Sequence, residues 1–164
     1  MSEAKDTPGV IAPPPLLALA AIVLGLALDR LLPAYMLTIL LSLTQRIVIG
    51  VVLIAAGLSL GFTALLAFRR AGTHVEPWKP STALVSEGVF AWLRNPMYVG
   101  VTCALIGLAV VLASDWMVVM TVFFALVIHV GVVKREERYL EIKFGNAYRH
   151  YKERVPRYGW PNLR

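Results

Sequence analysis

The chain has 164 residues, of which 58% are hydrophobic and 16% are charged, and its formal net charge is +6. Soluble domains carry about 25% charged and about 45–50% apolar residues, so this composition excludes an ordinary soluble protein and indicates an integral membrane protein. The basic residues flank apolar runs, as they do in membrane proteins. The positive charge therefore predicts contact with the lipid bilayer and no nucleic-acid partner.

The predicted fold is all-α, with about four transmembrane helices and an amphipathic helical tail. The apolar runs are at 16–32, 47–68, 97–113 and 116–133, each close to the about 20 residues that cross a bilayer. A shorter apolar run at 34–44 predicts a fifth, re-entrant or interfacial segment. Only Ser114 and Asp115 separate the last two spans, which predicts a tight helical hairpin.

We expect residues 1–164 to form a single membrane domain, because one domain is the default at this length. Its predicted parts are an N-terminal tail (1–12), N-terminal spans (13–68), a loop (69–96), a helical hairpin (97–133) and a helical tail (134–164).

Gly57 and Gly61 lie four residues apart in the second span. This small-xxx-small pattern is typical of closely packed membrane helices. It predicts a close helix contact, either within one chain or between two chains, so the oligomeric state stays open.

The tail from Lys134 is polar but keeps the apolar periodicity of a helix. Gly145 followed by Asn146 predicts a helix end and a new N-cap, and hence two short helices with a bend. Such a tail can rest on the membrane surface or fold over the ends of the hairpin.

Lysine and arginine counts predict the orientation of the chain. The loop holds four, the tail holds nine and the Ser114-Asp115 turn holds none. Because cytoplasmic segments carry the excess of basic residues, we expect a multi-pass protein with its loop and tail in the cytoplasm.

Polar residues gather at both ends of the hairpin. Arg94 and Asn95 precede it and Glu136 and Glu137 come after it, so a two-helix hairpin returns them to the same membrane surface. They form either a solvated membrane edge or a site for a ligand with polar and apolar parts. Free N–H groups at a helix start favour anions such as carboxylates.

Two further side chains are candidates for this site. Tyr98 lies one turn into the hairpin and can supply an aromatic wall. His129 lies inside the last span, where ionisable residues are costly and often functional. Glu136 lies seven residues later, within about 20° of the same helix face. The pair can bracket an elongated ligand, or His129 can bond to a backbone carbonyl while Glu136 faces water. Adjacent helical residues point about 100° apart, so Glu137 is expected to face elsewhere.

No metal-ligand spacing, dinucleotide loop or phosphate loop occurs in the sequence, so we predict no metal site.

Taken in order, these features resemble the superfamily of integral membrane methyltransferases that includes isoprenylcysteine carboxyl methyltransferases and phospholipid methyltransferases. The resemblance, to a bacterial-type member, covers roughly residues 72–157 and rests on the segment Arg94-Asn95-Pro96-Met97-Tyr98-Val99-Gly100, a two-span hairpin, His129, Glu136-Glu137 and Val155-Pro156-Arg157.

The resemblance implies an S-adenosylmethionine pocket formed by the last two spans and the tail. It implies cofactor binding by Asn95, Pro96, Tyr98, His129, Glu136 and Glu137, and catalytic positions at Arg94, Asn95, Tyr98 and Arg157. The expected substrate is a lipophilic or lipidated molecule.

Asn95 bears on the chemistry of the acceptor. Many family members have histidine at this position, and asparagine cannot act as a base. A carboxylate or thiolate acceptor needs no base, so Asn95 favours these over an amine. An amine acceptor must lose a proton, and His129 is then the candidate base. The alternatives are a phospholipid, amine or thiol methyltransferase of the same fold, a non-catalytic accessory protein, and a membrane reductase.

Overall fold

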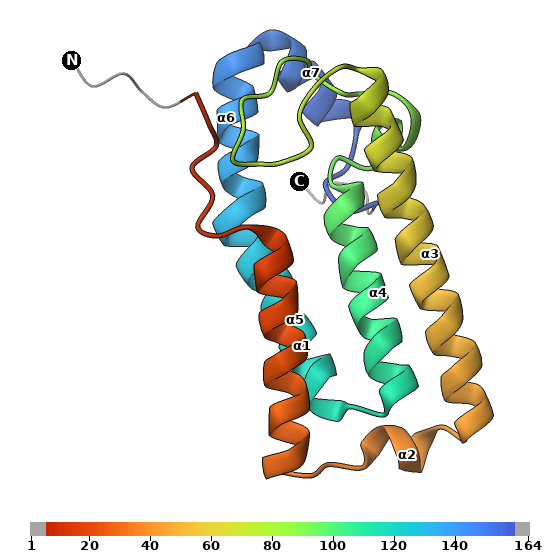
Figure 1. Cartoon of the computed structure of the whole chain (residues 1–164). Coiled ribbons are helices and arrows are strands. Elements are labelled where there is room, and N and C mark those ends of the chain that lie inside the picture. The colour runs from red at the N-terminus through yellow and green to blue at the C-terminus, as the bar shows by residue number, and fades with distance from the viewer. Residues whose placement is uncertain (1–5, 160–164) are drawn as a thin grey trace.

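The structure is a computed structural model that describes residues 6–159. Within that range every regular element is helical (Figure 1). The elements are α1 (Pro14–Leu31), α2 (Met36–Leu40), α3 (Leu43–Arg70), the 3₁₀ helix η1 (Gly88–Ala91), α4 (Pro96–Leu112), α5 (Asp115–Ile128), the π-helical turn η2 (His129–Val133), α6 (Lys134–Phe144) and α7 (Asn146–Arg154).

Three helical stretches are long and apolar enough to cross a membrane, namely Pro14–Leu31, Leu43–Arg70 and Asp115–Phe144. The fourth predicted span, Pro96–Leu112, is apolar but shorter, at 17 residues. These helices agree with an integral membrane protein.

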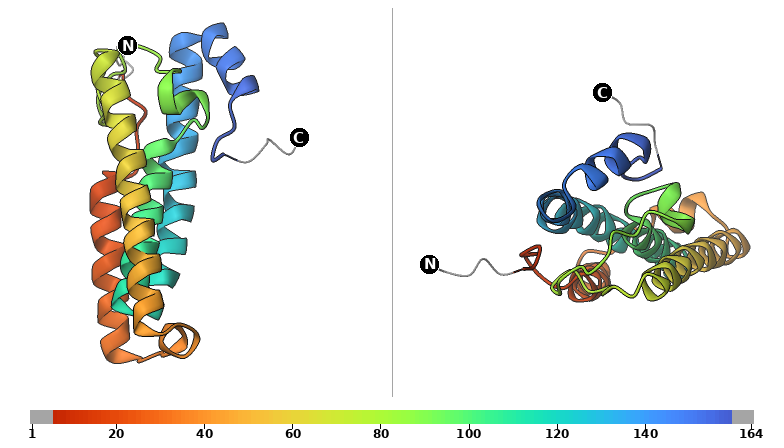
Figure 2. Two further views of the ribbon diagram at one scale, coloured as in Figure 1. Left: turned by 90° about the vertical axis from the view of Figure 1, so that its right-hand side faces the viewer. Right: turned by 90° about the horizontal axis from the view of Figure 1, so that it is seen from above.

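The long helices form an open bundle in which α1 packs along α5 rather than along α3, the long helix that follows it in sequence. α3 packs along α4, α4 along α5, and α5 along α1. Figure 2 shows this order from two sides. α6 continues the line of α5 beyond the bundle, and α7 turns back beside it (Figure 1). One end of the bundle therefore carries α6, α7 and the long loop between α3 and α4.

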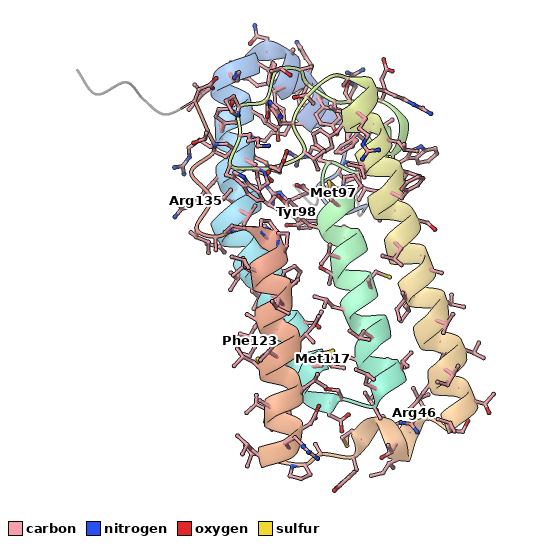
Figure 3. All side chains as sticks on the ribbon, in the orientation of Figure 1. Arg46, Met97, Tyr98, Met117, Phe123 and Arg135 are labelled. Atoms are coloured by element: carbon pink, nitrogen blue, oxygen red, sulfur yellow. The ribbon has the colours of Figure 1, made fainter. Side chains whose placement is uncertain are left out.

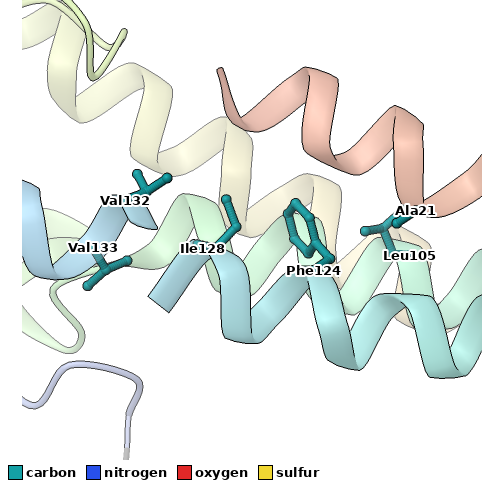
Figure 4. Close-up of a cluster of buried hydrophobic side chains, with 6 residues drawn as sticks. All are labelled: Ala21, Leu105, Phe124, Ile128, Val132 and Val133. Atoms are coloured by element: carbon teal, nitrogen blue, oxygen red, sulfur yellow. The ribbon is translucent and has the colours of Figure 1, made fainter. Parts of the chain in front are cut away.

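A cluster of buried apolar side chains joins α1, α4 and the α5–η2 segment (Figure 4). Its members are Ala21, Leu105, Phe124, Ile128, Val132 and Val133. Val132 and Val133 are fully buried, so this cluster extends to the point where α6 leaves the bundle.

Two glycine pairs bring α3 against α4. A Cβ atom on Gly50 would lie 2.6 Å from the carbonyl oxygen of Gly107, and one on Gly107 would lie 2.6 Å from that of Gly50. Gly57 and Gly100 meet in the same way, seven residues later in α3 and seven residues earlier in α4. The predicted close contact at Gly57 is thus confirmed, and its partner is α4 of the same chain. Gly61 differs, because a Cβ there would meet nothing within 4 Å.

The turn η2 corrects the predicted relation between His129 and Glu136. A regular helix would put the two on one face, but residues 129–133 form a π-helical turn. A π turn holds an extra residue, which rotates the helix beyond it relative to the helix before it. His129 and Glu136 consequently face different spaces.

The short segment predicted at 34–44 contains α2, which lies across the end of the bundle (Figure 1). The N–H groups of Met36 and Leu37 donate to the Asp115 carboxylate at 2.8 and 3.0 Å. A carboxylate at a helix start is stabilising, because the N–H groups there lack helical partners. Asp115 therefore fixes α2 to the hairpin turn.

The tail contains the two predicted short helices, separated at Gly145, whose φ is 52°. The predicted Asn146 N-cap is wrong in detail: Gly145 is the N-cap and Asn146 is the first helical residue. After α7 the chain returns to the bundle, where the Arg94 N–H donates to the Pro156 carbonyl at 3.0 Å. The tail thus folds over the end of the hairpin.

The glycine contacts predict that Gly57→Ala lowers stability. The new methyl group would lie 2.8 Å from the Ala104 nitrogen and against the Gly100 carbonyl. Overpacking of this kind costs about 1–3 kcal/mol. Unfolding by sodium dodecyl sulfate in mixed micelles measures the loss. Gly61→Ala is the matched control, with open space around its methyl group, and equal losses in both variants would contradict the assigned packing.

Candidate functional site

The candidate site is a pocket at the end of the bundle where α4 begins. Met97 and Tyr98 mark its position in Figure 3, below the α3–α4 loop and between α4 and α6. Its polar walls are supplied by Arg94, Asn95, Tyr98, Glu136, Glu137, Tyr139, Tyr148 and Tyr151. Pro96 also lines it, as the first residue of α4. The structure thus brings together residues from both ends of the hairpin, as the sequence predicts.

Glu137 lies between two guanidinium groups. Its Oε1 is 2.8 Å from Arg94 Nη1, and its Oε2 is 2.7 Å from Arg157 Nη2. Arg157 Nε also donates to Oε1 at 2.8 Å, so the Arg157 pair is bidentate. The Arg94 and Glu137 side chains are only 4% and 11% exposed. Two arginines and one carboxylate leave one excess positive charge beside the pocket.

Backbone contacts hold this cluster in place. Asn95 Nδ2 donates to the Arg157 carbonyl at 3.3 Å. Together with the bond from the Arg94 N–H to Pro156, it fastens the tail to the start of α4. Asn95 is buried, and its side-chain amide is bonded to the backbone of Arg157.

Glu136 contacts Tyr98 instead of the arginines. Its Oε2 accepts a hydrogen bond from the Tyr98 hydroxyl at 3.0 Å. Both residues line the pocket. The two adjacent glutamates point to different partners, as the sequence predicts: Glu137 to the arginines and Glu136 to Tyr98. The pocket consequently presents a cationic side and an anionic side.

Aromatic residues from α7 and η1 close the pocket wall. Arg94 Nη1 donates to the Tyr148 hydroxyl at 3.4 Å, and the Tyr151 hydroxyl donates to the Phe90 carbonyl at 2.7 Å. Burial, reinforced by the nearby Glu137 charge, raises the pKa of Tyr148 to about 12. The hydrogen bonds to Glu137 raise the pKa of Arg157 above its ordinary value. Tyr148 is thus neutral and Arg157 charged at physiological pH.

His129 lies outside this pocket, in a second space. A mostly apolar groove of about 560 Å³ runs between α4 and α5, and His129 lines it together with Tyr98 and Tyr158. His129 Nδ1 is 2.8 Å from the Tyr158 hydroxyl, which is its hydrogen-bond partner. Tyr98 lines both the pocket and the groove. The two spaces therefore meet at this residue.

Sequence reasoning assigned no site role to four tyrosines near the site, Tyr139, Tyr148, Tyr151 and Tyr158. Tyr148 and Tyr151 carry a signal as part of the apolar face of the tail and of the spacing Phe-Gly-x-x-Tyr-x-x-Tyr at 144–151. Tyr158 comes directly after the motif but falls outside any periodic pattern, so nothing in the sequence connects it with His129. Among the residues that the structure describes, no group of three or more potential ligands could hold a metal ion.

Comparison with known proteins identifies the family. The family model for phospholipid methyltransferase matches residues 45–147. That match covers more than half of the chain and both ends of the hairpin. The chain belongs to the phospholipid methyltransferase family.

Curated relatives carry a more specific name. A protein-S-isoprenylcysteine O-methyltransferase of Schizosaccharomyces pombe is 28% identical over 129 residues, which cover 76% of this chain and 52% of the relative. Protein-S-isoprenylcysteine O-methyltransferase B of Arabidopsis thaliana is 32% identical over 112 residues, covering 65% and 55%. The chain thus spans about half the length of these relatives. No solved structure matches it significantly.

The burial of the Glu137 cluster predicts that Glu137→Gln is strongly destabilising. Removing one charge of a buried pair leaves the other uncompensated, at a cost of about 3–5 kcal/mol. Detergent unfolding of the purified variant measures the loss. Glu141→Gln is the control, because Glu141 pairs with Lys152 and Arg149 near the surface and its loss should be much smaller. Similar losses in both variants would contradict the central role of Glu137.

Proposed function

We propose that this protein is an S-adenosylmethionine-dependent methyltransferase that acts on a lipophilic acceptor in the membrane. One observation carries the proposal: a pocket with opposed charged sides meets a lipid-facing groove at a single residue, Tyr98. Membership of the methyltransferase family supports the reaction class.

The side chains of the pocket fit the chemistry of the methyl donor. Its amino-acid part carries a carboxylate and an ammonium group, and its sulfonium is cationic. Arg94 and Arg157, with one charge in excess over Glu137, suit the carboxylate. Arg94 Nε, buried and without a partner in residues 6–159, offers a further donor. The Glu136 carboxylate and the ring of Tyr98 suit the cationic groups, because aromatic faces attract cations.

The groove between α4 and α5 fits the apolar part of an acceptor. Apolar side chains line it along much of its length, namely Val99, Ile106, Val122 and Leu126. Val122 and Leu126 are exposed, on a surface that a bilayer would cover. An acceptor lying there would have its polar end near Tyr98, His129 and Tyr158. The methyl donor and the acceptor would then meet from opposite sides of Tyr98.

The residues of this chain act mainly by positioning. S-adenosylmethionine supplies a methyl group already activated on a sulfonium, so alignment with the acceptor is the main task that remains. Asn95 is fixed to the Arg157 carbonyl and acts by holding the tail in place. A carboxylate acceptor requires no base, which favours an acceptor of the isoprenylcysteine kind, as the names of the relatives suggest.

His129 favours a second candidate. His129 lines the groove close to where the polar end of the acceptor would lie. An amine acceptor needs a base at that place, and a histidine side chain can act as one. A phospholipid amine is thus the alternative substrate class. For either acceptor we propose that α6, α7 and the α3–α4 loop face the cytoplasm, as the distribution of lysine and arginine suggests.

Binding of S-adenosylmethionine, measured by calorimetry on detergent-purified protein, tests the proposal. We expect micromolar affinity for the wild type and at least tenfold weaker binding for Glu136→Gln. A hydrogen bond to a charged group contributes about 1.5–3 kcal/mol, which corresponds to that loss. Glu153→Gln, at a position 72% exposed in its side chain, is the matched control and should bind normally.

The absence of binding by a folded, monodisperse wild-type protein would refute the methyltransferase assignment. In that case a non-catalytic accessory role becomes the better account of the retained fold.

A further inference from the structure

The side chains of the pocket suit S-adenosylmethionine chemically, but in this structure the pocket is too small to hold it. Its volume is about 100 Å³, whereas sites for ligands of the size of S-adenosylmethionine measure about 300–1,000 Å³. The pocket must therefore widen for such a ligand to enter. The question is which of its walls can move.

Half of the residues that line the pocket lie in packed helices. α4, α6 and α7 are joined through the Glu137 cluster, and Phe68 at the end of α3 packs edge-on against Phe90. The remaining wall consists of non-helical chain, which we call the cover. It comprises the N-terminal segment 6–13 and the loop 73–85, and contributes Pro8, His74, Val75, Glu76, Pro77, Ser81, Ala83, Leu84 and Val85 to the pocket.

The loop of the cover is closed on itself. The Thr82 N–H donates to Thr73 Oγ1 at 2.9 Å, and Thr82 Oγ1 donates to the Gly72 carbonyl at 3.1 Å. These bonds join the two ends of the segment 73–82. Residues 73–82 consequently form one hydrogen-bonded unit, whereas Leu84 and Val85 pack against the buried cluster around Tyr148 and anchor the end of the loop.

Both parts of the cover meet on one side chain of α6. The Tyr139 hydroxyl donates to Asp6 Oδ1 at 2.9 Å and accepts from the Ser81 N–H at 3.1 Å. Lys143 Nζ lies 2.6 Å from Asp6 Oδ2 and 2.9 Å from the Tyr139 hydroxyl. We call these contacts of Asp6, Ser81, Tyr139 and Lys143 the latch.

The N-terminal segment runs along α6 below the latch (Figure 1). Arg135 Nη1 donates to the Gly9 carbonyl at 2.6 Å, and the Ile11 N–H donates to the Gly131 carbonyl at 3.2 Å. Arg135 lies on the side of α6 along which this segment runs (Figure 3). The Ile11 side chain fills the place that a Cβ on Gly131 would take. A run of polar contacts thus holds the segment over the pocket.

We propose that the cover is a gate for the methyl donor, closed by the latch and opened by its release. The inference rests on the proposed function, because it takes the pocket as the donor site. The latch suits a reversible gate, because its ion pair is solvent-exposed, with Asp6 59% exposed, and exposed pairs are individually weak. The Glu137 cluster, by contrast, is buried and stays closed while the cover moves.

The latch can be locked by a reversible cross-link. Cys103 is the sole cysteine of the chain, so a Cys103→Ser background leaves no other thiol. Asp6→Cys and Lys143→Cys are then bridged with a bifunctional methanethiosulfonate reagent, which reductant removes. Glu141→Cys with Lys152→Cys is the matched control, because that pair joins α6 to α7 and leaves the cover free. Tritiated S-adenosylmethionine is the probe, and each protein is compared with its own unbridged state.

The gate predicts that bridging before loading slows uptake at least tenfold, and that bridging after loading slows release to the same extent. Reductant should restore both rates, and the control bridge should change neither. A second variant, Asp6→Asn, opens the latch without a cross-link and should speed release several-fold.

Two results would contradict the proposal in different ways. Normal uptake and release by the bridged protein, together with an unchanged release rate in Asp6→Asn, would overturn the gate and leave the donor site intact. Failure of the unbridged protein to bind the probe would overturn the proposed function, and the gate with it.

Discussion

The candidate site depends on the ion pairs that the buried carboxylate of Glu137 forms with Arg94 and Arg157. This carboxylate joins α6 to Arg94 at the start of α4 and to Arg157 in the chain after α7. Buried charges are tolerated only when they are paired and hydrogen-bonded, so the three segments must converge for any of them to be stable. The same pairing leaves one positive charge over. The constraint that folds the tail over the hairpin therefore also places this charge beside the pocket that we propose binds an anionic group.

The chain contains two spaces of different chemical character. Beyond the ends of the long helices, α6, α7 and the α3–α4 loop surround a charged pocket; between α4 and α5 runs an apolar groove. Tyr98 belongs to both and donates its hydroxyl to Glu136. Transfer between a water-soluble donor and a lipid acceptor requires a point at which both can meet without either entering the wrong solvent. In the proposed reaction Tyr98 would occupy such a point.

The sequence predicts the membrane class, the hairpin and the convergence of Arg94 and Glu137, because apolar span lengths and short turns constrain them directly. It does not predict the π turn at 129–133, since that turn arises from packing rather than from local propensity. The prediction assumed a regular helix and therefore placed His129 beside Glu136 in the pocket, whereas His129 lines the groove. Contacts between distant segments are equally hidden from sequence, among them Gly50 with Gly107, Tyr158 with His129, and Asp6 with Tyr139. Each of these contacts depends on which segments become neighbours in space. The periodicity within one helix does not indicate which segments those are.

The most direct test of the account is methyl transfer itself. Purified protein in lipid nanodiscs is supplied with methyl-tritiated S-adenosylmethionine and a membrane lipid extract, and organic-extractable label is counted. We expect labelled lipid with the wild type and almost none with Glu136→Gln. Release of the label by mild base would identify a methyl ester, and hence a carboxylate acceptor; base-stable label would identify an amine or thiol. A folded protein that binds the donor but labels no lipid would contradict the central claim that pocket and groove serve one transfer reaction.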